Sequence, residues 1–268
     1  MKPRDVARKH RAIVAALLCW FGRNARDLPW RRTRDPYGIW VSEIMLQQTQ
    51  VKTVIPYWQR WMGALSSIQS LAKARSEKIH KLWEGLGYYG RVRNLQRAAQ
   101  LIVRDHGGKF PKRFDDVLAL PGIGRYTAGA ICSIAFDQPQ PILDGNVIRL
   151  LTRLFGIRGN PRKSGVNKEL WKLAGQLVVS AAETNSAASP GDSRSFFDPQ
   201  SSGDPPGLCS RLNQALMELG ALVCTPKQPG CETCPLNRLC IAHQEGSVKQ
   251  LPQLTLSRPT TPRSEEHV

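Results

Sequence analysis

The stretch Leu120-Pro-Gly-Ile-Gly-Arg-Tyr-Thr-Ala-Gly-Ala, residues 120–130, decides the fold. Gly122 and Gly124 allow a tight backbone turn that other residues disfavour. The small residues from Thr127 onwards then begin a helix whose first turn another molecule can approach closely. Unpaired backbone N–H groups at such a turn bind anions, and for a basic protein the first anion to consider is a phosphate. We therefore expect a helix, a glycine-rich turn and a second helix, with an anion site at the turn.

The segment that follows, Pro141-Ile-Leu-Asp-Gly-Asn-Val, places Asp144 at the expected N-cap of a further helix. Aspartate is among the preferred N-cap residues, so one interpretation is a carboxylate that only closes the helix end. The other is a carboxylate held at a fixed place facing a bound phosphodiester. The two interpretations do not exclude each other.

The composition indicates a basic globular protein with nucleic acid as its partner. The chain of 268 residues has 38 Lys and Arg against 21 Asp and Glu, a formal net charge of +17, and seven Trp. This excess favours a polyanion, and because no stretch approaches the length of a membrane-spanning helix, nucleic acid is favoured over anionic lipid. The apolar run at 12–21 follows a basic start but precedes no small-residue cleavage site. We expect it to be an amphipathic helix of a cytoplasmic, nucleoid-associated monomer without membrane contact.

One carboxylate lies on the apolar face of the helix predicted over residues 38–51. Glu43 stands three and four positions after Trp40 and Ile39, so it shares their face. Desolvation on such a face raises the pKa of a carboxyl group, as a general acid working near neutral pH requires. The alternative is a solvated glutamate on an exposed face. The amides of residues 47–50 suit hydrogen bonding to base edges or filling a gap in a base stack; the alternative is a merely polar helix end.

The loop Gly85-Leu-Gly-Tyr-Tyr-Gly, residues 85–90, contains two aromatic residues and is followed by Arg91, Arg93 and Arg97. Aromatic rings such as Tyr88 can stack on bases while neighbouring guanidinium groups meet phosphates. The alternative is an aromatic pair packed in a local core.

The remaining pattern indicates an all-α fold, because we find no alternating strand pattern and no internal repeat. Further helices are expected over residues 57–65, 77–83, 96–106, 166–182 and 211–224. Ser, Pro, Gly and Asp dominate residues 183–208, which we expect to be a disordered insertion, and we expect a flexible tail over 246–268.

Four cysteines lie within a 17-residue run, at Cys224, Cys231, Cys234 and Cys240. A zinc site is the alternative, but a four-cysteine zinc ribbon usually has two separated Cys-x-x-Cys pairs. This run has one short pair and two wider intervals. A 4Fe–4S cluster is bound by four cysteine thiolates, which one compact loop of this spacing can supply.

The cysteine spacing resembles that of the iron–sulfur branch of the helix-hairpin-helix base-excision DNA glycosylases. Within that family, WVSEIMLQQTQV (40–51), GLGYYGRVRNL (85–95) and PILDGNV (141–147) are similar to the MutY-type adenine DNA glycosylases. The resemblance covers residues 20–242 apart from the insertion. It implies a two-lobed, all-α fold, with a six-helix lobe over 30–140 and a 4Fe–4S lobe formed by 1–29 and 141–245.

The same resemblance implies a monofunctional glycosylase that removes adenine mispaired with 8-oxoguanine or guanine in double-stranded DNA. Adenine must be flipped from the duplex before its glycosidic bond is reachable. By this resemblance Glu43 protonates the base and Asp144 stabilises the oxocarbenium-like sugar, a division of labour that parallels sugar hydrolysis. Tyr126 supports the site and stands where endonuclease III has a lysine, so lyase chemistry through a Schiff base is not expected.

The resemblance also assigns four residues to substrate binding. Arg31 and Gln214 are expected to hold the adenine, while Gln48 and Tyr88 enter the opened base stack. Members of the family usually continue into a second domain that helps to recognise 8-oxoguanine, and we expect this chain, which ends at Val268, to lack it. Two alternatives remain: a thymine glycosylase acting on T·G mismatches, and an iron–sulfur DNA-binding protein without catalysis.

Overall fold

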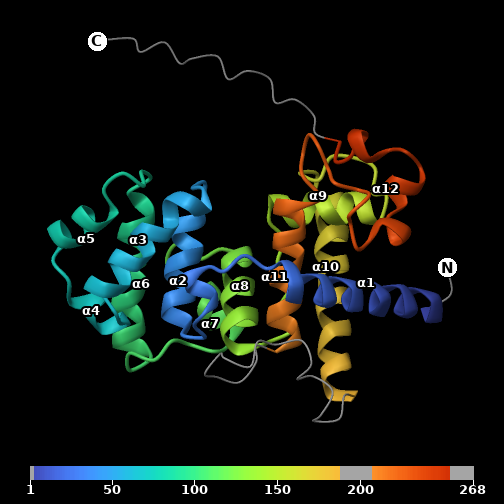
Figure 1. Cartoon of the computed structure of the whole chain (residues 1–268). Helices are drawn as coiled ribbons and strands as arrows, with labels where there is room; N and C mark the ends of the chain where they lie inside the picture. The colour runs from blue at the N-terminus through green and yellow to red at the C-terminus, as the bar shows by residue number, and fades with distance from the viewer. Residues whose placement is uncertain (1–2, 188–206, 254–268) are drawn as a thin grey trace, which may run out of the picture.

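The computed structural model describes residues 3–187 and 207–253, and this part of the chain is helical with no strand, which confirms the all-α prediction (Figure 1). Within the same residues, no helix combines the length and apolar character needed to cross a membrane. The α-helices are α1 (Pro3–Asn24), α2 (Pro36–Leu46), α3 (Val51–Ala64), α4 (Ile68–Lys73), α5 (Ser76–Trp83), α6 (Gly90–Asp105), α7 (Phe114–Leu118), α8 (Arg125–Phe136), α9 (Gly145–Leu154), α10 (Ser164–Ala187), α11 (Leu208–Leu222) and α12 (Ile241–Gln244). Short 3-10 turns are η1 (Pro29–Arg31), η3 (Asn237–Leu239) and η4 (Val248–Gln250).

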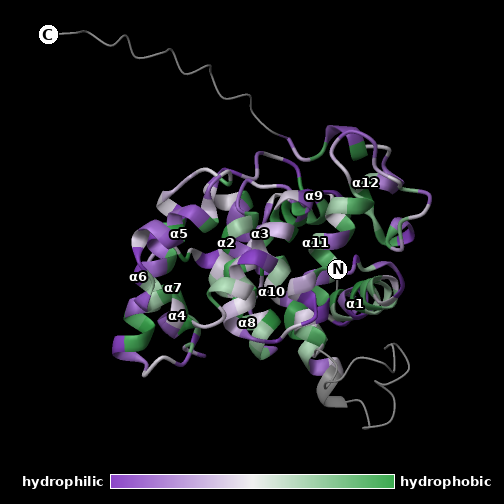
Figure 2. Ribbon diagram, turned by 60° about the vertical axis from the view of Figure 1, so that its left-hand side comes forward, coloured by the Kyte–Doolittle hydropathy of each residue, from purple (hydrophilic) through white to green (hydrophobic). Residues whose placement is uncertain are grey.

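The helices enclose two hydrophobic cores. The first is built by α2 to α8 around the fully buried Trp40, Trp61 and Trp83. The rings of Trp61 and Trp83 pack edge to face, with their centroids 5.7 Å apart. The second is built by α1, α9, α10 and α11. Helix α8 contributes to both cores, and in Figure 1 it stands beside α11 between the two groups of helices. The hydrophobic and hydrophilic faces of the helices, which determine this packing, are coloured in Figure 2.

The glycine-rich turn joins α7 to α8 as predicted. Gly122 has a φ of +78°, and a Cβ there would lie 2.8 Å from the Cβ of Asn94, so both conformation and space demand glycine. Gly124 is the N-cap of α8; it is exposed, and no atom lies within 4 Å of where its Cβ would stand. Farther along α8, a Cβ on Gly129 would lie 2.3 Å from the carbonyl oxygen of Pro141. This close crossing brings the segment before α9, and therefore Asp144, against α8.

Several predicted boundaries were wrong. The helix expected over 38–51 is divided, because α2 ends at Leu46 and Gln48 adopts a φ of +58° before α3 begins. Helix α10 continues to Ala187, so residues 183–187 of the expected insertion are helical, and 207–208 open α11. The rest of that insertion, 188–206, lies outside the described residues. The expected tail begins with a packed segment that includes η4 and the buried Leu251, and residues 254–268 are not described.

Candidate active site

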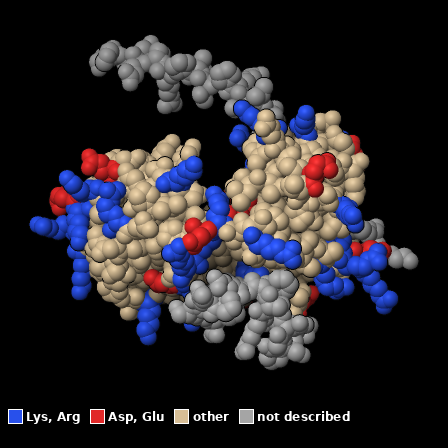
Figure 3. Space-filling model, in the orientation of Figure 1, with Lys and Arg blue, Asp and Glu red and all other residues tan. Residues whose placement is uncertain are grey.

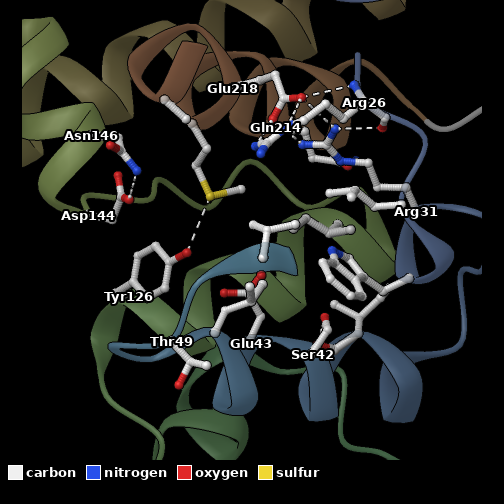
Figure 4. Close-up of a pocket in the computed structure, with 18 residues that line it drawn as sticks. Arg26, Arg31, Ser42, Glu43, Thr49, Tyr126, Asp144, Asn146, Gln214 and Glu218 are labelled. Carbon is white, nitrogen blue, oxygen red and sulfur yellow. Dashed lines mark hydrogen bonds and ion pairs between the residues drawn. The ribbon is translucent and has the colours of Figure 1, made fainter. Parts of the chain in front are cut away.

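A cavity of about 270 Å³ opens where α2, α8, α9 and α11 meet the η1 turn (Figure 4). This is slightly below the range of about 300–1,000 Å³ for pockets that take drug-sized ligands, and it suits a single base better than a larger molecule. Five of the predicted site residues line it: Arg31, Glu43, Tyr126, Asp144 and Gln214. Further lining residues that the sequence analysis did not select are Arg26, Leu28, Trp30, Ile39, Ser42, Leu46, Thr49, Val51, Ile134, Asn146, Met217, Glu218 and Ala221.

Glu43 faces this cavity from α2, a helix in which residues 37–45 are all buried. Its side chain is only 6% exposed, which rules out the solvated alternative. Burial raises the pKa of Glu43 to about 7; the charge of Asp144 adds to this, while a hydrogen bond with Tyr126 and the charge of Arg31 act against it. The carboxyl group is therefore poised between its acid and base forms at neutral pH, as a general acid requires.

Tyr126 reaches the cavity from the first turn of α8. Its hydroxyl group lies 3.3 Å from the sulfur of Met217 and also interacts with Glu43. Burial and the negative charges of Glu43 and Asp144 raise the pKa of Tyr126 well above its usual value. The hydroxyl group consequently remains protonated and can donate a hydrogen bond.

Asp144 is the N-cap of α9, as predicted. Its Oδ1 accepts a hydrogen bond from the backbone N–H of Val147 at 2.8 Å, and its Oδ2 accepts one from the side-chain amide of Asn146 at 2.9 Å. Asp144 nevertheless lines the cavity. Asp144 therefore both caps α9 and faces the cavity, and its two hydrogen bonds hold both of its carboxylate oxygens in place.

A chain of hydrogen bonds leads from Asp144 to the cysteine loop. Asn146, which donates to Asp144, accepts a hydrogen bond from Arg149 at 2.9 Å through its Oδ1. Arg149 also donates from Nε to the carbonyl oxygen of Cys224 at 2.7 Å. One side of α9 therefore connects the candidate active site directly to the first of the four cysteines.

Glu218 on α11 anchors the opposite wall of the cavity, and it was not predicted from the sequence. It is 1% exposed and forms ion pairs with Arg31 at 2.9 Å and Arg26 at 2.7 Å. Burial would raise the pKa of Glu218, but hydrogen bonds from the two arginines outweigh it and lower the pKa to about 2. Gln214 lies one helical turn before Glu218 and is also buried, with its amide donating to Ser210 at 3.2 Å. That spacing of four residues is the signal from which Glu218 could have been found.

The two residues expected to enter the base stack lie outside this cavity. Tyr88 is 65% exposed, so the local-core alternative is wrong for it, and it lines a second cavity of about 330 Å³ together with Gly122. Gln48 is exposed, and its neighbours in sequence line different cavities: Gln47 lines the second and Thr49 the first. The interpretation of Arg91 as a phosphate contact was wrong, because its guanidinium group is bonded to backbone carbonyl oxygens.

All four cysteines of the C-terminal run line one apolar pocket beside α9. Burial raises the pKa of Cys231, Cys234 and Cys240, that of Cys234 to about 11, and the charge of neighbouring thiolates adds to each shift. A guanidinium N–H of Arg153 lies 3.4 Å from the sulfur of Cys224. No group of three or more His, Cys, Asp or Glu residues in 3–187 and 207–253 has the arrangement expected to hold a metal ion. The four thiols do share one pocket, in which a cationic group would stabilise their thiolate forms.

The surface is basic on both sides of a groove. Figure 3 shows Lys and Arg side chains spread over both groups of helices, with a hollow between them, and these side chains outnumber Asp and Glu on this face. This distribution suits an extended polyanion rather than a small charged ligand.

Comparisons with known proteins give a consistent result. Residues 41–176 match the family described as HhH-GPD superfamily base excision DNA repair protein. The adenine DNA glycosylase of Rattus norvegicus is 46% identical over 248 residues, which cover 88% of this chain and 43% of the relative. The corresponding protein of Homo sapiens is 44% identical over 257 residues, covering 92% of this chain and 42% of the relative. The chain thus spans less than half the length of these two relatives.

Solved structures share the fold. A thermostable thymine-DNA glycosylase matches with a TM-score of 0.72 and 29% identity, covering 89% of this chain and 98% of that one. Endonuclease III in a non-covalent DNA complex matches with a TM-score of 0.66 over 90% of this chain and 97% of that one. At 19% identity, the second likeness supports the fold alone.

Proposed function

The chain belongs to the HhH-GPD superfamily of base excision DNA repair proteins, and from this premise we propose that it is a monofunctional DNA glycosylase that removes adenine mispaired with 8-oxoguanine or guanine. The observation that carries the proposal is a pair of carboxyl groups facing one base-sized cavity. One, on Glu43, has its pKa raised to about 7, and the other, on Asp144, is fixed by its N-cap bonds. The adenine DNA glycosylases among the relatives, at 44–46% identity, favour adenine over the thymine of the structural neighbour at 29%.

The first step is protonation of the base. Adenine leaves poorly as an anion, so an acid must give a ring nitrogen a proton as the glycosidic bond breaks. Glu43 lines the cavity and burial raises its pKa to about 7, so it is assigned this proton. The neutral hydroxyl of Tyr126 interacts with Glu43 and keeps its side chain directed into the cavity.

The second step is stabilisation of the sugar. Departure of the base leaves an oxocarbenium-like ring, which a carboxylate at close range stabilises. Asp144 suits this role because its two hydrogen bonds hold it without reorganisation. Water then attacks the sugar, and Glu43, which is ionised after giving up its proton, can accept one from that water.

The far wall of the cavity is proposed to hold the adenine. Arg31 and Gln214 project donors and acceptors there, and Glu218 fixes Arg31 through its ion pair. Trp30 supplies an apolar surface. Outside the cavity, Gln48 and Tyr88 are proposed to occupy the gap that the flipped base leaves in the stack.

The four cysteines are proposed to hold a 4Fe–4S cluster in a lobe formed by 1–29 and 141–245. In support, the residues fit: four thiols line one pocket, and a guanidinium nitrogen of Arg153 lies 3.4 Å from the sulfur of Cys224. A cluster there would stabilise the four thiolates and tie the loop into one unit. The other lobe, over 30–140, is proposed to contain the helix-hairpin-helix, with the monomer binding double-stranded DNA across the basic groove.

Single-turnover base release tests the proposal. Duplexes carrying adenine opposite 8-oxoguanine, adenine opposite guanine, or thymine opposite guanine are each mixed with excess protein. We expect free adenine and an intact abasic strand that breaks only on alkali treatment. Release of thymine would show instead that the protein is a thymine glycosylase. Strand cleavage without alkali would exclude the monofunctional mechanism. DNA binding without release of any base would mean that the protein is an iron–sulfur DNA-binding protein without catalysis.

A further inference from the structure

Arg91, the second residue of α6, has a guanidinium group turned toward the protein rather than toward a ligand. Its Nη1 donates to the carbonyl oxygens of Ile44 at 2.9 Å, Met45 at 3.1 Å and Gln47 at 2.5 Å. The first two carbonyls belong to the last turn of α2 and the third to its C-cap, and the last four carbonyls of a helix lack partners within it. A cation at this end is also favoured by the helix dipole. Arg91 therefore terminates the helix that carries the candidate general acid.

The same guanidinium group holds the aromatic loop. Its Nη2 donates to the carbonyl oxygen of Leu86 at 2.9 Å. Its charge lies over the ring of Tyr88 at 5.5 Å and over the ring of Trp83 at 5.3 Å. One side chain thus connects the end of α2 with the 85–90 loop, although α3, α4 and α5 lie between these two segments in sequence.

Both segments carry a residue in an unfavourable backbone conformation. Leu46 to Thr49 form a turn closed by a 3.3 Å hydrogen bond, with φ/ψ of −59°/111° at Gln47 and a φ of +58° at Gln48. This is a type II turn, whose third position normally takes glycine or asparagine. Tyr88 has a φ of +47°. Such conformations persist only where the surroundings impose them.

The two strained residues are the ones assigned to the opened base stack. Both are exposed, and Gln48 stands between Thr49, which lines the base-sized cavity, and Gln47, which lines the second cavity together with Tyr88. We propose that Arg91 is a positioning residue that holds Gln48 and Tyr88 in the shape that opens the stack beside the target base. The inference rests on the proposed function, since it concerns the step before base release.

A stack-opening assay compares Arg91→Lys with wild type. Lysine keeps the charge but lacks the planar fork that reaches both segments. The matched control is Arg104→Lys, on the same helix, whose side chain is 71% exposed and pairs with Asp105. Opening is followed by the fluorescence of 2-aminopurine placed next to an A·G mispair, and base release is measured on the same duplex and on one with adenine opposite an abasic site.

We expect Arg91→Lys to slow both fluorescence rise and base release on the A·G duplex by about tenfold or more, the effect of losing one hydrogen bond to a charged group. Arg104→Lys should match wild type. On the abasic duplex, where no partner base must be separated, the deficit of Arg91→Lys should disappear. An equal loss on both duplexes would make Arg91 merely structural, and no loss on either would remove it from the mechanism.

Hydrogen–deuterium exchange on the wild-type protein gives a second test that needs no substitution. Residues 44–50 and 84–90 should already be protected in the free protein, because Arg91 forms these shapes in advance. Protection that arises only on DNA binding would overturn the proposal. If wild type releases no adenine from either duplex, the proposed function fails, while fluorescence and exchange still decide the role of Arg91.

Discussion

Replacing Glu43 with glutamine should make the protein more stable at neutral and alkaline pH while abolishing base release. Burial raises the pKa of Glu43 from its ordinary 4.5 to about 7. The folded protein therefore binds this proton more tightly than the unfolded chain. Its contribution to stability is complete below about pH 4.5 and is lost as the pH rises through about 7, a total of roughly 3 kcal/mol at about 1.4 kcal/mol per pKa unit. Glutamine has the same shape and no charge to bury, so Glu43→Gln avoids this loss.

Thermal melts from pH 5 to pH 8.5 measure the effect. Over this range the melting temperature of Glu43→Gln should rise relative to wild type by about 5–10 °C, which corresponds to 2–3 kcal/mol in a chain of this size. The control is Glu169→Gln, an exposed residue of α10, whose melting curve should follow wild type at every pH. Parallel pH dependences for wild type and Glu43→Gln would refute the reasoning, because they would mean that Glu43 is not held in a pocket that disfavours its charge.

Three further outcomes are expected. Glu218→Gln should lower the melting temperature, because breaking a buried ion pair costs about 3–5 kcal/mol. Since the pKa of Glu218 is lowered to about 2, the loss of stability should be complete above about pH 4.5 and should shrink as the pH falls toward 2. A loss of stability that does not change with pH would contradict this. Cys231→Ser should lose the absorbance near about 400 nm expected of a 4Fe–4S protein, and unchanged iron content by elemental analysis would remove Cys231 from the ligand set. Gly129→Ala should destabilise the fold by about 1–3 kcal/mol in denaturant titrations, because its Cβ would lie 2.3 Å from the carbonyl oxygen of Pro141. The control is Gly175→Ala, because no atom lies within 4 Å of where the Cβ of residue 175 would stand, and it should be neutral or stabilising. Equal losses of stability in the two variants would show that Gly129 and Pro141 are not in close contact.

The features predicted best from the sequence are those that depend on local chemistry. Asp144 could be placed at an N-cap because aspartate precedes a helix-forming segment, and the structure has that hydrogen bond. Glu43 could be placed on an apolar face because helical spacing fixes its neighbours, and the structure buries it. The glycine-rich turn followed from the conformations that only glycine adopts readily, as the positive φ of Gly122 shows.

The features that were missed depend on contacts between distant segments. The pattern through residues 38–51 is helical without a break, yet α2 ends at Leu46, where Arg91 from another helix binds its last carbonyls. Glu218 became part of the site only when α11 packed beside η1 and two arginines reached it. The same long-range folding explains why Arg91 was wrongly assigned to phosphates: its sequence neighbours are aromatic and basic, but its Nη1 is bonded to carbonyl oxygens more than 40 residues away.

The central claim is that Glu43 protonates an adenine held in the cavity, and the most direct test is the pH dependence of single-turnover adenine release from an A·G duplex. With wild type, the rate should be constant below about pH 7 and fall about tenfold per pH unit above it, since the acid form is required. Glu43→Gln should bind the duplex with little change in affinity and release no adenine at any pH. Adenine release by Glu43→Gln at a rate comparable to wild type would contradict the account.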